Sequence, residues 1–153
     1  MNIELEELYQ QVILDHSRRP RNFGDLPGAV GLGAAVDYLE KIGRPAIFAH
    51  DSELTAHALQ CLGELPGVRI LGPAGQRGAL VAFHAEWAHP HDLTTFANEH
   101  GLALRGGHHC TQPLMRKLRL PGTTRASFYF YNTLEEVDRM AAILRDAHRF
   151  FNR

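Results

Sequence analysis

The stretch VRILGPAGQRGALVAFH, residues 68–84, decides the fold class of this chain. Val68–Leu71 and Ala79–His84 are short runs rich in β-forming residues, and the turn-rich segment GPAGQRG separates them. This pattern predicts two strands. Helical patterns precede the stretch, and strand and helix patterns alternate after it. That order predicts an α+β domain in which helices flank a small mixed β-sheet.

The residues on both sides of this stretch predict further elements. Pro45 suits the first turn of a helix, and Gly43 suits the end of the helix before it. Thr133 and Glu136 have the spacing of a capping box, in which each side chain accepts from the other residue's backbone N–H. The predicted elements are helices over 29–42, 45–65, 89–100, 112–118 and 134–150, and strands over 102–105 and 126–131.

The first residues differ in character from the rest of the chain. Apolar residues at helical spacing over residues 3–18 predict a helix, and Asp25–Gly28 (DLPG) has the composition of a linker. We therefore expect an extra N-terminal helix with its linker over residues 1–27, and the α+β domain over residues 28–153.

Composition and charge exclude several classes of protein. The 153 residues are 44% hydrophobic and 22% charged, which is ordinary globular usage and not that of a disordered chain. Sixteen Lys+Arg and seventeen Asp+Glu give a net charge of −1, so no nucleic-acid partner is expected. The longest apolar run, ALVAF, is too short to span a bilayer, and the acidic N-terminus does not resemble a signal peptide. These features predict a cytoplasmic protein without a membrane partner.

The two cysteines differ in their surroundings and are too few for a disulfide framework. Cys61 lies between leucines of a predicted helix and is expected in the core. Cys110 lies in RGGHHCTQP, where two glycines predict backbone freedom, and the arginine and either histidine when protonated can favour a thiolate. Two interpretations stay open for Cys110: a reactive thiol on a mobile loop, or a small buried cysteine in a tight turn.

A metal site is a competing interpretation of the histidines. His57 and Cys61 stand four residues apart, which places two possible zinc ligands on one face of a helix. Such pairs arise often by chance, and no usual zinc motif joins the other candidates, so no metal site is predicted. The other candidates are His84, His89, His91, His108, His109 and Cys110.

Arg125 stands just before the aromatic segment ASFYFY. The planar guanidinium can bind a carboxylate through two parallel hydrogen bonds, and the alternative is an ordinary surface arginine. Lysine is scarce, since Lys41 and Lys117 are the two lysines of the sequence. An amine nucleophile would therefore have few positions to occupy.

Four stretches resemble the C-terminal small domain of SUF-type cysteine desulfurases, which belong to the class V aminotransferase family. They are GLGAAVDYLEKIG, HDSELTAHALQCLGELPGVRILGP, HPHDLTTFANEHGLALRGGHHCTQPLM and TRASFYFYNTLEEVDRM. The resemblance implies the α+β small domain of fold-type I pyridoxal phosphate enzymes. It also implies that Cys110 is the catalytic thiol that becomes a persulfide, with His108 and His109 beside it, and that Arg125 binds the substrate carboxylate.

The N-terminal segment resembles a different protein. LEELYQQVILDHSRRPRNFGDL is similar to the opening helix and turn of SufU/IscU-type iron–sulfur scaffold proteins. Together the two resemblances imply sulfur mobilisation for iron–sulfur cluster assembly. Partners of this kind would be assembly proteins that donate or accept sulfur.

The same resemblance bears on cofactor and activity. In the family, a lysine of the large domain holds pyridoxal phosphate within a Ser-x-His-Lys pattern, and neither Lys41 nor Lys117 has that context. We therefore expect no cofactor in this chain alone and no independent desulfurase turnover. The alternative function is a persulfide carrier or partner-binding module that uses Cys110. Apolar surface left open where a large domain would dock also predicts self-association.

Overall fold

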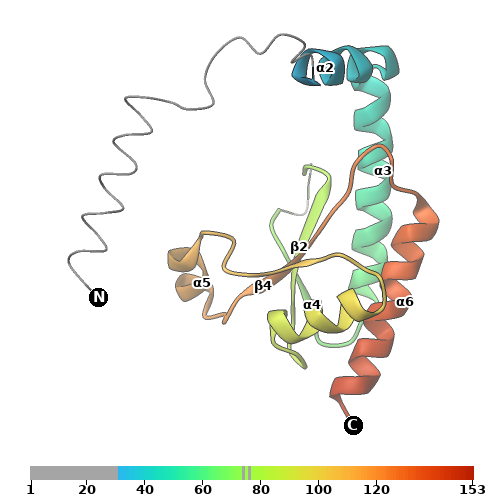
Figure 1. The fold of residues 1–153 in the computed structure, drawn as a ribbon. Helices are drawn as coiled ribbons and strands as arrows, with labels where there is room; N and C mark the ends of the chain where they lie inside the picture. Colours follow the sequence, from blue (N-terminus) through green and yellow to red (C-terminus); the bar gives the residue numbers. More distant parts are fainter. Residues whose placement is uncertain (1–30, 74, 76) are drawn as a thin grey trace. The chain divides into compact units, whose positions relative to one another are not determined.

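Figure 1 shows the fold in a computed structural model, which describes residues 31–73, 75 and 77–153. The chain divides into two compact units, Met1–Lys41 and Ile42–Arg153. The described part of the first unit belongs to helix α2, Gly31–Ile42, where a helix was predicted. The predicted N-terminal helix and the predicted boundary after residue 27 lie outside the described residues.

The second unit is built on a four-stranded sheet, and its α+β class confirms the prediction. The strands lie in the order β1-β2-β4-β3, and all pairings of the described strands are antiparallel. The strand bounds are β1 Val68–Leu71, β2 Leu80–Ala85, β3 Arg105–Gly107 and β4 Thr123–Ser127.

The prediction of a mixed sheet was wrong in its strand directions. β2 and β3 both run antiparallel to β4, so they point the same way and could have formed a parallel pair. β4 comes later in the chain but lies between them, which leaves each strand beside an antiparallel neighbour. Strand patterns do not encode this insertion, because they describe the residues of one strand and not its neighbours.

The aromatic residues after β4 form a turn, although a strand was predicted over 126–131. The backbone N–H of Tyr129 donates to Oδ1 of Asn132 at 3.0 Å, and the N–H of Asn132 donates to the carbonyl of Tyr129 at 2.9 Å. The strand therefore ends at Ser127. In the same way, β3 begins at Arg105 and not at residue 102.

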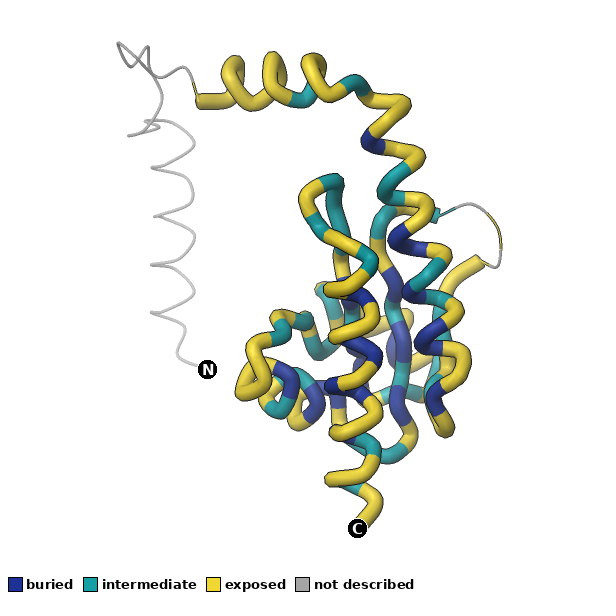
Figure 2. Tube along the Cα trace, turned by 90° about the vertical axis from the view of Figure 1, so that its right-hand side faces the viewer, coloured by how far each residue is buried: buried dark blue, intermediate teal, exposed yellow. Residues whose placement is uncertain are grey.

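Helices α3 (Arg44–Gly63), α4 (Pro90–Glu99) and α6 (Leu134–Phe151) pack on one face of this sheet. The alternating burial of β2 identifies that face, since Val81, Phe83 and Ala85 are buried. Figure 2 shows the buried positions along the strands and along one side of the helices. Large core side chains are Leu54, Leu62, Val81, Phe83, Leu93, Met140 and Leu144.

The opposite face of the sheet is more open. On β2, Leu80 is exposed, and Ala82 and His84 are half-buried. Helix α5, Gln112–Leu118, lies to one side of the strands and follows the loop that contains Cys110 (Figure 1). The open face and the Cys110 loop are therefore available for polar chemistry.

The predicted capping box at the start of α6 is confirmed. The N–H of Glu136 donates to Oγ1 of Thr133 at 3.3 Å, and the N–H of Thr133 donates to Oε2 of Glu136 at 3.1 Å.

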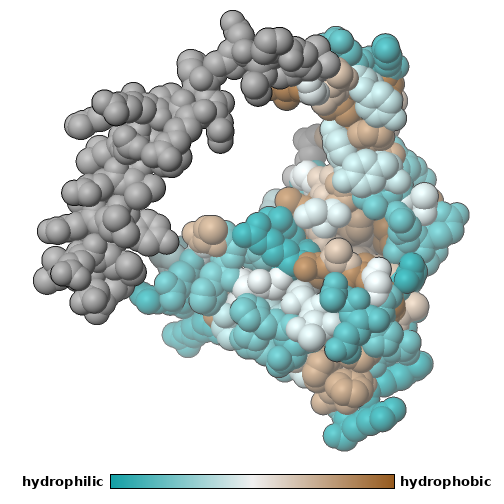
Figure 3. All heavy atoms as spheres, viewed as in Figure 1, coloured by the Kyte–Doolittle hydropathy of each residue, from teal (hydrophilic) through white to brown (hydrophobic). Residues whose placement is uncertain are grey.

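Apolar surface gathers near the C-terminal end of α6 in Figure 3, where Phe150 is 54% exposed. Within the described residues, every helix is too short or too polar to cross a membrane.

Candidate functional site

The loop after β3 displays the predicted thiol. Cys110 is exposed, so the interpretation of a buried cysteine was wrong. His108 is also exposed, and His109 is half-buried. The loop lies at the edge of the sheet, because β3 is an edge strand.

Gly106 and Gly107, just before this loop, were expected to make it mobile. Their contacts show that they allow close packing instead. Both belong to β3, where Gly106 pairs with Thr124 of β4. A Cβ on Gly106 would lie 2.6 Å from the carbonyl oxygen of Pro90, at the start of α4. Glycine therefore lets α4 approach the strand, and it anchors the base of the loop.

The loop holds two consecutive residues in the left-handed region. His109 has φ 52° and Cys110 has φ 61°, a conformation that side chains other than glycine rarely adopt and that concentrates at functional sites. Thr111 supports it, since its Oγ1–H and its N–H donate to the carbonyl of His108 at 2.7 and 2.9 Å. The Cys110 thiol is thus exposed on a tight turn that the hydrogen bonds of Thr111 stabilise.

His109 connects the loop to β4. Its Nε2 lies 3.1 Å from the carbonyl oxygen of Thr123, which can only accept, so Nε2 carries the hydrogen. Burial lowers the pKa of His109, the hydrogen bond to Thr123 opposes this, and the charges of Arg125 and Arg105 lower it further. His109 is therefore a neutral imidazole near pH 7 and is not the cation that the sequence suggested.

Arg125 and Arg105 face each other across the β3–β4 pairing. Like charges in directly opposite positions repel, and an anion between them would remove the penalty. The Nε of Arg125 is buried and has no hydrogen-bond partner among the described residues. The Nδ1 atoms of His84 and His109 are in the same state. Buried polar atoms are normally paired, so the guanidinium of Arg125 keeps a donor for an acceptor such as a carboxylate oxygen.

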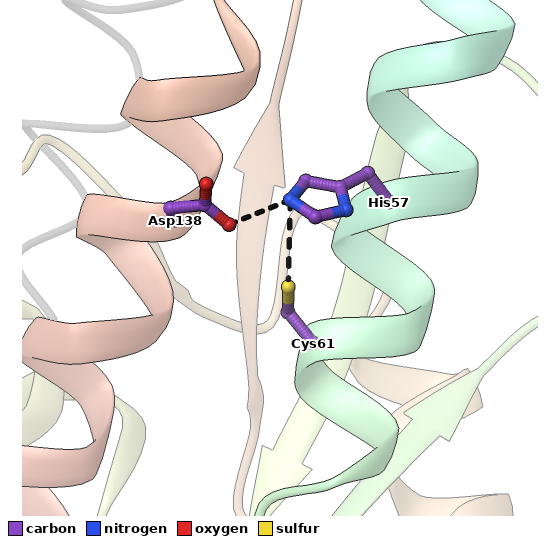
Figure 4. Close-up of side chains that lie close together, drawn as sticks. All are labelled: His57, Cys61 and Asp138. Atoms are coloured by element: carbon purple, nitrogen blue, oxygen red, sulfur yellow. Dashed lines mark hydrogen bonds and ion pairs between the residues drawn. The ribbon is translucent and has the colours of Figure 1, made fainter.

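A second cluster lies between α3 and α6 (Figure 4). The Nε2 of His57 is 2.6 Å from Oδ1 of Asp138 and 3.8 Å from Sγ of Cys61. Cys61 is buried, as predicted for a core position. Burial raises the pKa of its thiol, and the negative charges of Asp138 and Glu64 raise it further, against Arg145. Sequence reasoning paired His57 with Cys61 but missed Asp138, which is 81 residues beyond His57.

The histidines around the Cys110 loop do not form a three-ligand group within the part of the chain that the structure describes. His89 is instead the N-cap of α4, since its Nδ1 accepts from the N–H of His91 at 3.3 Å. The cluster of His57, Cys61 and Asp138 is the group whose ligand atoms all lie within 4.8 Å of one another.

The sequence profile of the Aminotransferase class-V family matches residues 13–140, so the chain belongs to that family. Among curated relatives it is similar to a probable cysteine desulfurase of Halalkalibacterium halodurans, with 48% identity over 126 residues. A probable cysteine desulfurase of Streptomyces coelicolor is 46% identical to it over 125 residues. These alignments cover 82% and 80% of this chain but 31% and 30% of the relatives. The chain thus spans about a third of the length of the curated relatives it matches.

Solved structures agree with this assignment. The apo cysteine desulfurase of Thermococcus onnurineus NA1 superposes with a TM-score of 0.76 at 34% identity, covering 86% of this chain and 34% of that one. The cysteine desulfurase CsdA of Escherichia coli superposes with a TM-score of 0.73 at 33% identity, covering 84% and 32%. The predicted desulfurase resemblance is therefore confirmed at the level of the family. The family match begins at residue 13, inside the segment for which a scaffold-like origin was predicted, and that origin stays a prediction.

Cysteine desulfurases use pyridoxal phosphate, and neither lysine of this chain fits the Schiff base with that group. A Schiff base needs an enclosed amine, whereas Lys41 on α2 and Lys117 on α5 are both exposed. We therefore assign to this chain no step that passes through the cofactor.

Proposed function

We propose that residues 28–153 act as the C-terminal small domain of a cysteine desulfurase, with Cys110 as the sulfur-accepting thiol. The observation that carries this proposal is the exposed Cys110 on a turn of two left-handed residues, beside an edge strand of the open sheet face. An accessible thiolate can attack a zero-valent sulfur held by a donor, so that the S–S bond of a persulfide forms while the donor's own group leaves with the electron pair of the broken bond. A tight turn keeps the thiol in one place.

In this proposal, Arg125 binds the carboxylate of the substrate and Arg105 adds a second positive charge. The facing positions of the two arginines and the unpaired Nε of Arg125 support this role. In this proposal exposed His108, two residues before Cys110, is the group that accepts the proton of the thiol, and His109 holds the loop to β4 through its hydrogen bond to Thr123.

The proposal limits what this chain does unaided. Both lysines of the chain are exposed and neither is enclosed, so we expect the 153-residue chain by itself not to release sulfide or alanine from cysteine. The chain is similar to probable cysteine desulfurases and to solved cysteine desulfurase structures, and this favours a desulfurase domain over an independent persulfide carrier. We assign this domain to sulfur supply for iron–sulfur clusters, with sulfur-donating or sulfur-accepting proteins as partners.

A domain exchange tests the proposal. Residues 28–153 replace the corresponding C-terminal region of the Halalkalibacterium halodurans relative, to which this chain is 48% identical over 126 residues. We expect the hybrid to release alanine from cysteine and the same hybrid with Cys110→Ser to lose that activity. Cys61→Ala, which keeps that core position apolar, is the control for loss of the other thiol and should leave the activity nearly unchanged.

A second measurement separates the functions. The isolated chain, treated with a low-molecular-weight persulfide, should gain the mass of one sulfur atom at Cys110. An inactive but folded hybrid together with normal labelling of the isolated chain would favour the carrier function. A hybrid whose activity survives Cys110→Ser would contradict the assignment of the thiol.

A further inference from the structure

Three side chains on two helices outside the Cys110 site converge as possible metal ligands. His57 and Cys61 are one turn apart on α3, and Asp138 faces them from α6 (Figure 4). Their ligand atoms, Nε2, Sγ and Oδ1, all lie within 4.8 Å of one another. Imidazole, thiolate and carboxylate are the three ligand types that zinc uses in proteins.

The distances are close to those of a tetrahedral site. Standard zinc–sulfur and zinc–nitrogen bonds at a tetrahedral angle place the two ligand atoms about 3.6 Å apart. The Sγ of Cys61 and the Nε2 of His57 are 3.8 Å apart, so this pair is already in position. The same geometry needs about 3.3 Å between nitrogen and oxygen, whereas Nε2 and Oδ1 are 2.6 Å apart.

Asp138 would therefore have to withdraw by less than about 1 Å to admit an ion. Its side chain is 63% exposed, which gives it room to move, and that of His57 is 31% exposed. Cys61 is buried and closes the inner side of the cluster. An ion held by these three residues would keep one position open to water, as three-ligand zinc sites do.

The charges around the thiol favour a cation. The negative charges of Asp138 and Glu64 act on Cys61, and the positive charge of Arg145 opposes them. Two negative charges against one positive charge stabilise a divalent ion. The hydrogen bond between His57 and Asp138 is the arrangement without an ion, and it keeps the imidazole directed at the carboxylate.

We propose that His57, Cys61 and Asp138 form a binding site for a borderline-soft divalent transition ion, with zinc as the natural occupant and water as the fourth ligand. On binding, the thiol of Cys61 releases its proton to solvent, and His57 binds as the neutral imidazole with its hydrogen on Nδ1, so the metal takes a lone pair from Sγ and one from Nε2 without any oxidation. The bound ion joins α3 to α6 across the helical layer. This site does not depend on the function proposed for Cys110.

Cobalt is the probe for this site, because a cobalt–thiolate bond gives a charge-transfer absorption in the near ultraviolet. The full chain is used with Cys110→Ser, which leaves Cys61 as its remaining thiol. We expect one equivalent of Co²⁺ to produce this absorption, and zinc to displace the cobalt and remove it. The melting temperature should rise with zinc concentration, since the ion binds the folded chain.

Two variants and one control define the ligands. Asp138→Asn should weaken cobalt binding by about tenfold or more, and Cys61→Ser should abolish the charge-transfer absorption. Asp146→Asn is the matched control, because Asp146 lies on the same helix and pairs with Arg149. It should bind cobalt like the parent chain. Circular dichroism verifies that each variant is folded.

Several results would overturn the site. One is the absence of a thiolate–cobalt absorption in the folded Cys110→Ser chain at millimolar cobalt. Another is an absorption that survives Cys61→Ser. A third is equal binding by the Asp138→Asn and Asp146→Asn variants. Because Asp138 is exposed, its variant tests the site even if Cys61→Ser fails to fold.

Discussion

The two thiols of this chain occupy opposite environments. Cys110 is exposed on a held turn, and Cys61 is buried on α3 with its pKa raised by burial and by nearby carboxylates. A thiolate reacts and a thiol does not, so a raised pKa leaves less of the reactive form of Cys61 at any given pH.

We predict that iodoacetamide modifies Cys110 well before Cys61 in the folded chain. Modification of Cys61 should become appreciable only at higher pH or after unfolding. Peptide mass spectrometry across a pH series measures both rates in one sample, and the Cys110→Ser chain isolates the slow one. Equal rates at neutral pH would mean that Cys61 is accessible in solution.

Gly106 of β3 packs closely against the start of α4. Because Gly106 has no Cβ, the carbonyl oxygen of Pro90 can lie 2.6 Å from the position that a Cβ would occupy. Gly106→Ala should destabilise the fold by about 1–3 kcal/mol, because α4 or β3 has to shift. Urea unfolding measures the change. Gly78→Ala is the matched control, since no atom lies within 4 Å of its added Cβ, and it should leave stability nearly unchanged.

At the scale of elements, α6 depends on its N-terminal cap. The Oε2 of Glu136 accepts hydrogen bonds from the side-chain amide of Asn132 at 2.9 Å and from the N–H of Thr133 at 3.1 Å. These two hydrogen bonds lower the pKa of Glu136 below its ordinary value, and the bond from Asn132 has the larger effect. The cap therefore joins the aromatic turn after β4 to the helix that covers the sheet.

This lowered pKa predicts how stability depends on pH. The ionised form of Glu136 stabilises the folded chain fully above the pKa that the group has when unfolded, and the contribution disappears as pH falls through the lower folded pKa. Glu136→Gln should reduce the loss of melting temperature between neutral and acidic pH. Thermal unfolding followed by circular dichroism at several pH values provides the measurement. Parallel curves for the parent and variant would show that the cap carries no pH-dependent stability.

At the scale of the whole molecule, exposed apolar side chains should drive association. Leu114 of α5 is 48% exposed close to the Cys110 loop, and Phe150 of α6 is 54% exposed. We predict that the 153-residue chain self-associates at micromolar concentration and that Leu114→Glu lowers the sedimentation coefficient. A monomeric parent chain in sedimentation velocity would contradict this. Glu53→Gln, at an exposed position of α3, serves as a control for the effect of any surface change.

The sequence by itself determined those features that depend on neighbouring residues. The α+β class followed from the two strand patterns of residues 68–84 and the helices around them. The capping box of Thr133 and Glu136 and the extent of α5 also matched the structure. These succeed because a cap or a helical turn involves groups three or four residues apart. The motif around Cys110 led to the desulfurase family in the same local way.

Tertiary structure alone decided what depends on distant residues. It placed β4 between β2 and β3, which made the sheet antiparallel. It also brought Pro90 against Gly106, so the glycine serves packing and not mobility. Asp138 meets His57 across 81 residues of sequence. Such contacts arise when separate elements pack together, and a local sequence pattern specifies that a face is apolar but not which element lies beside it.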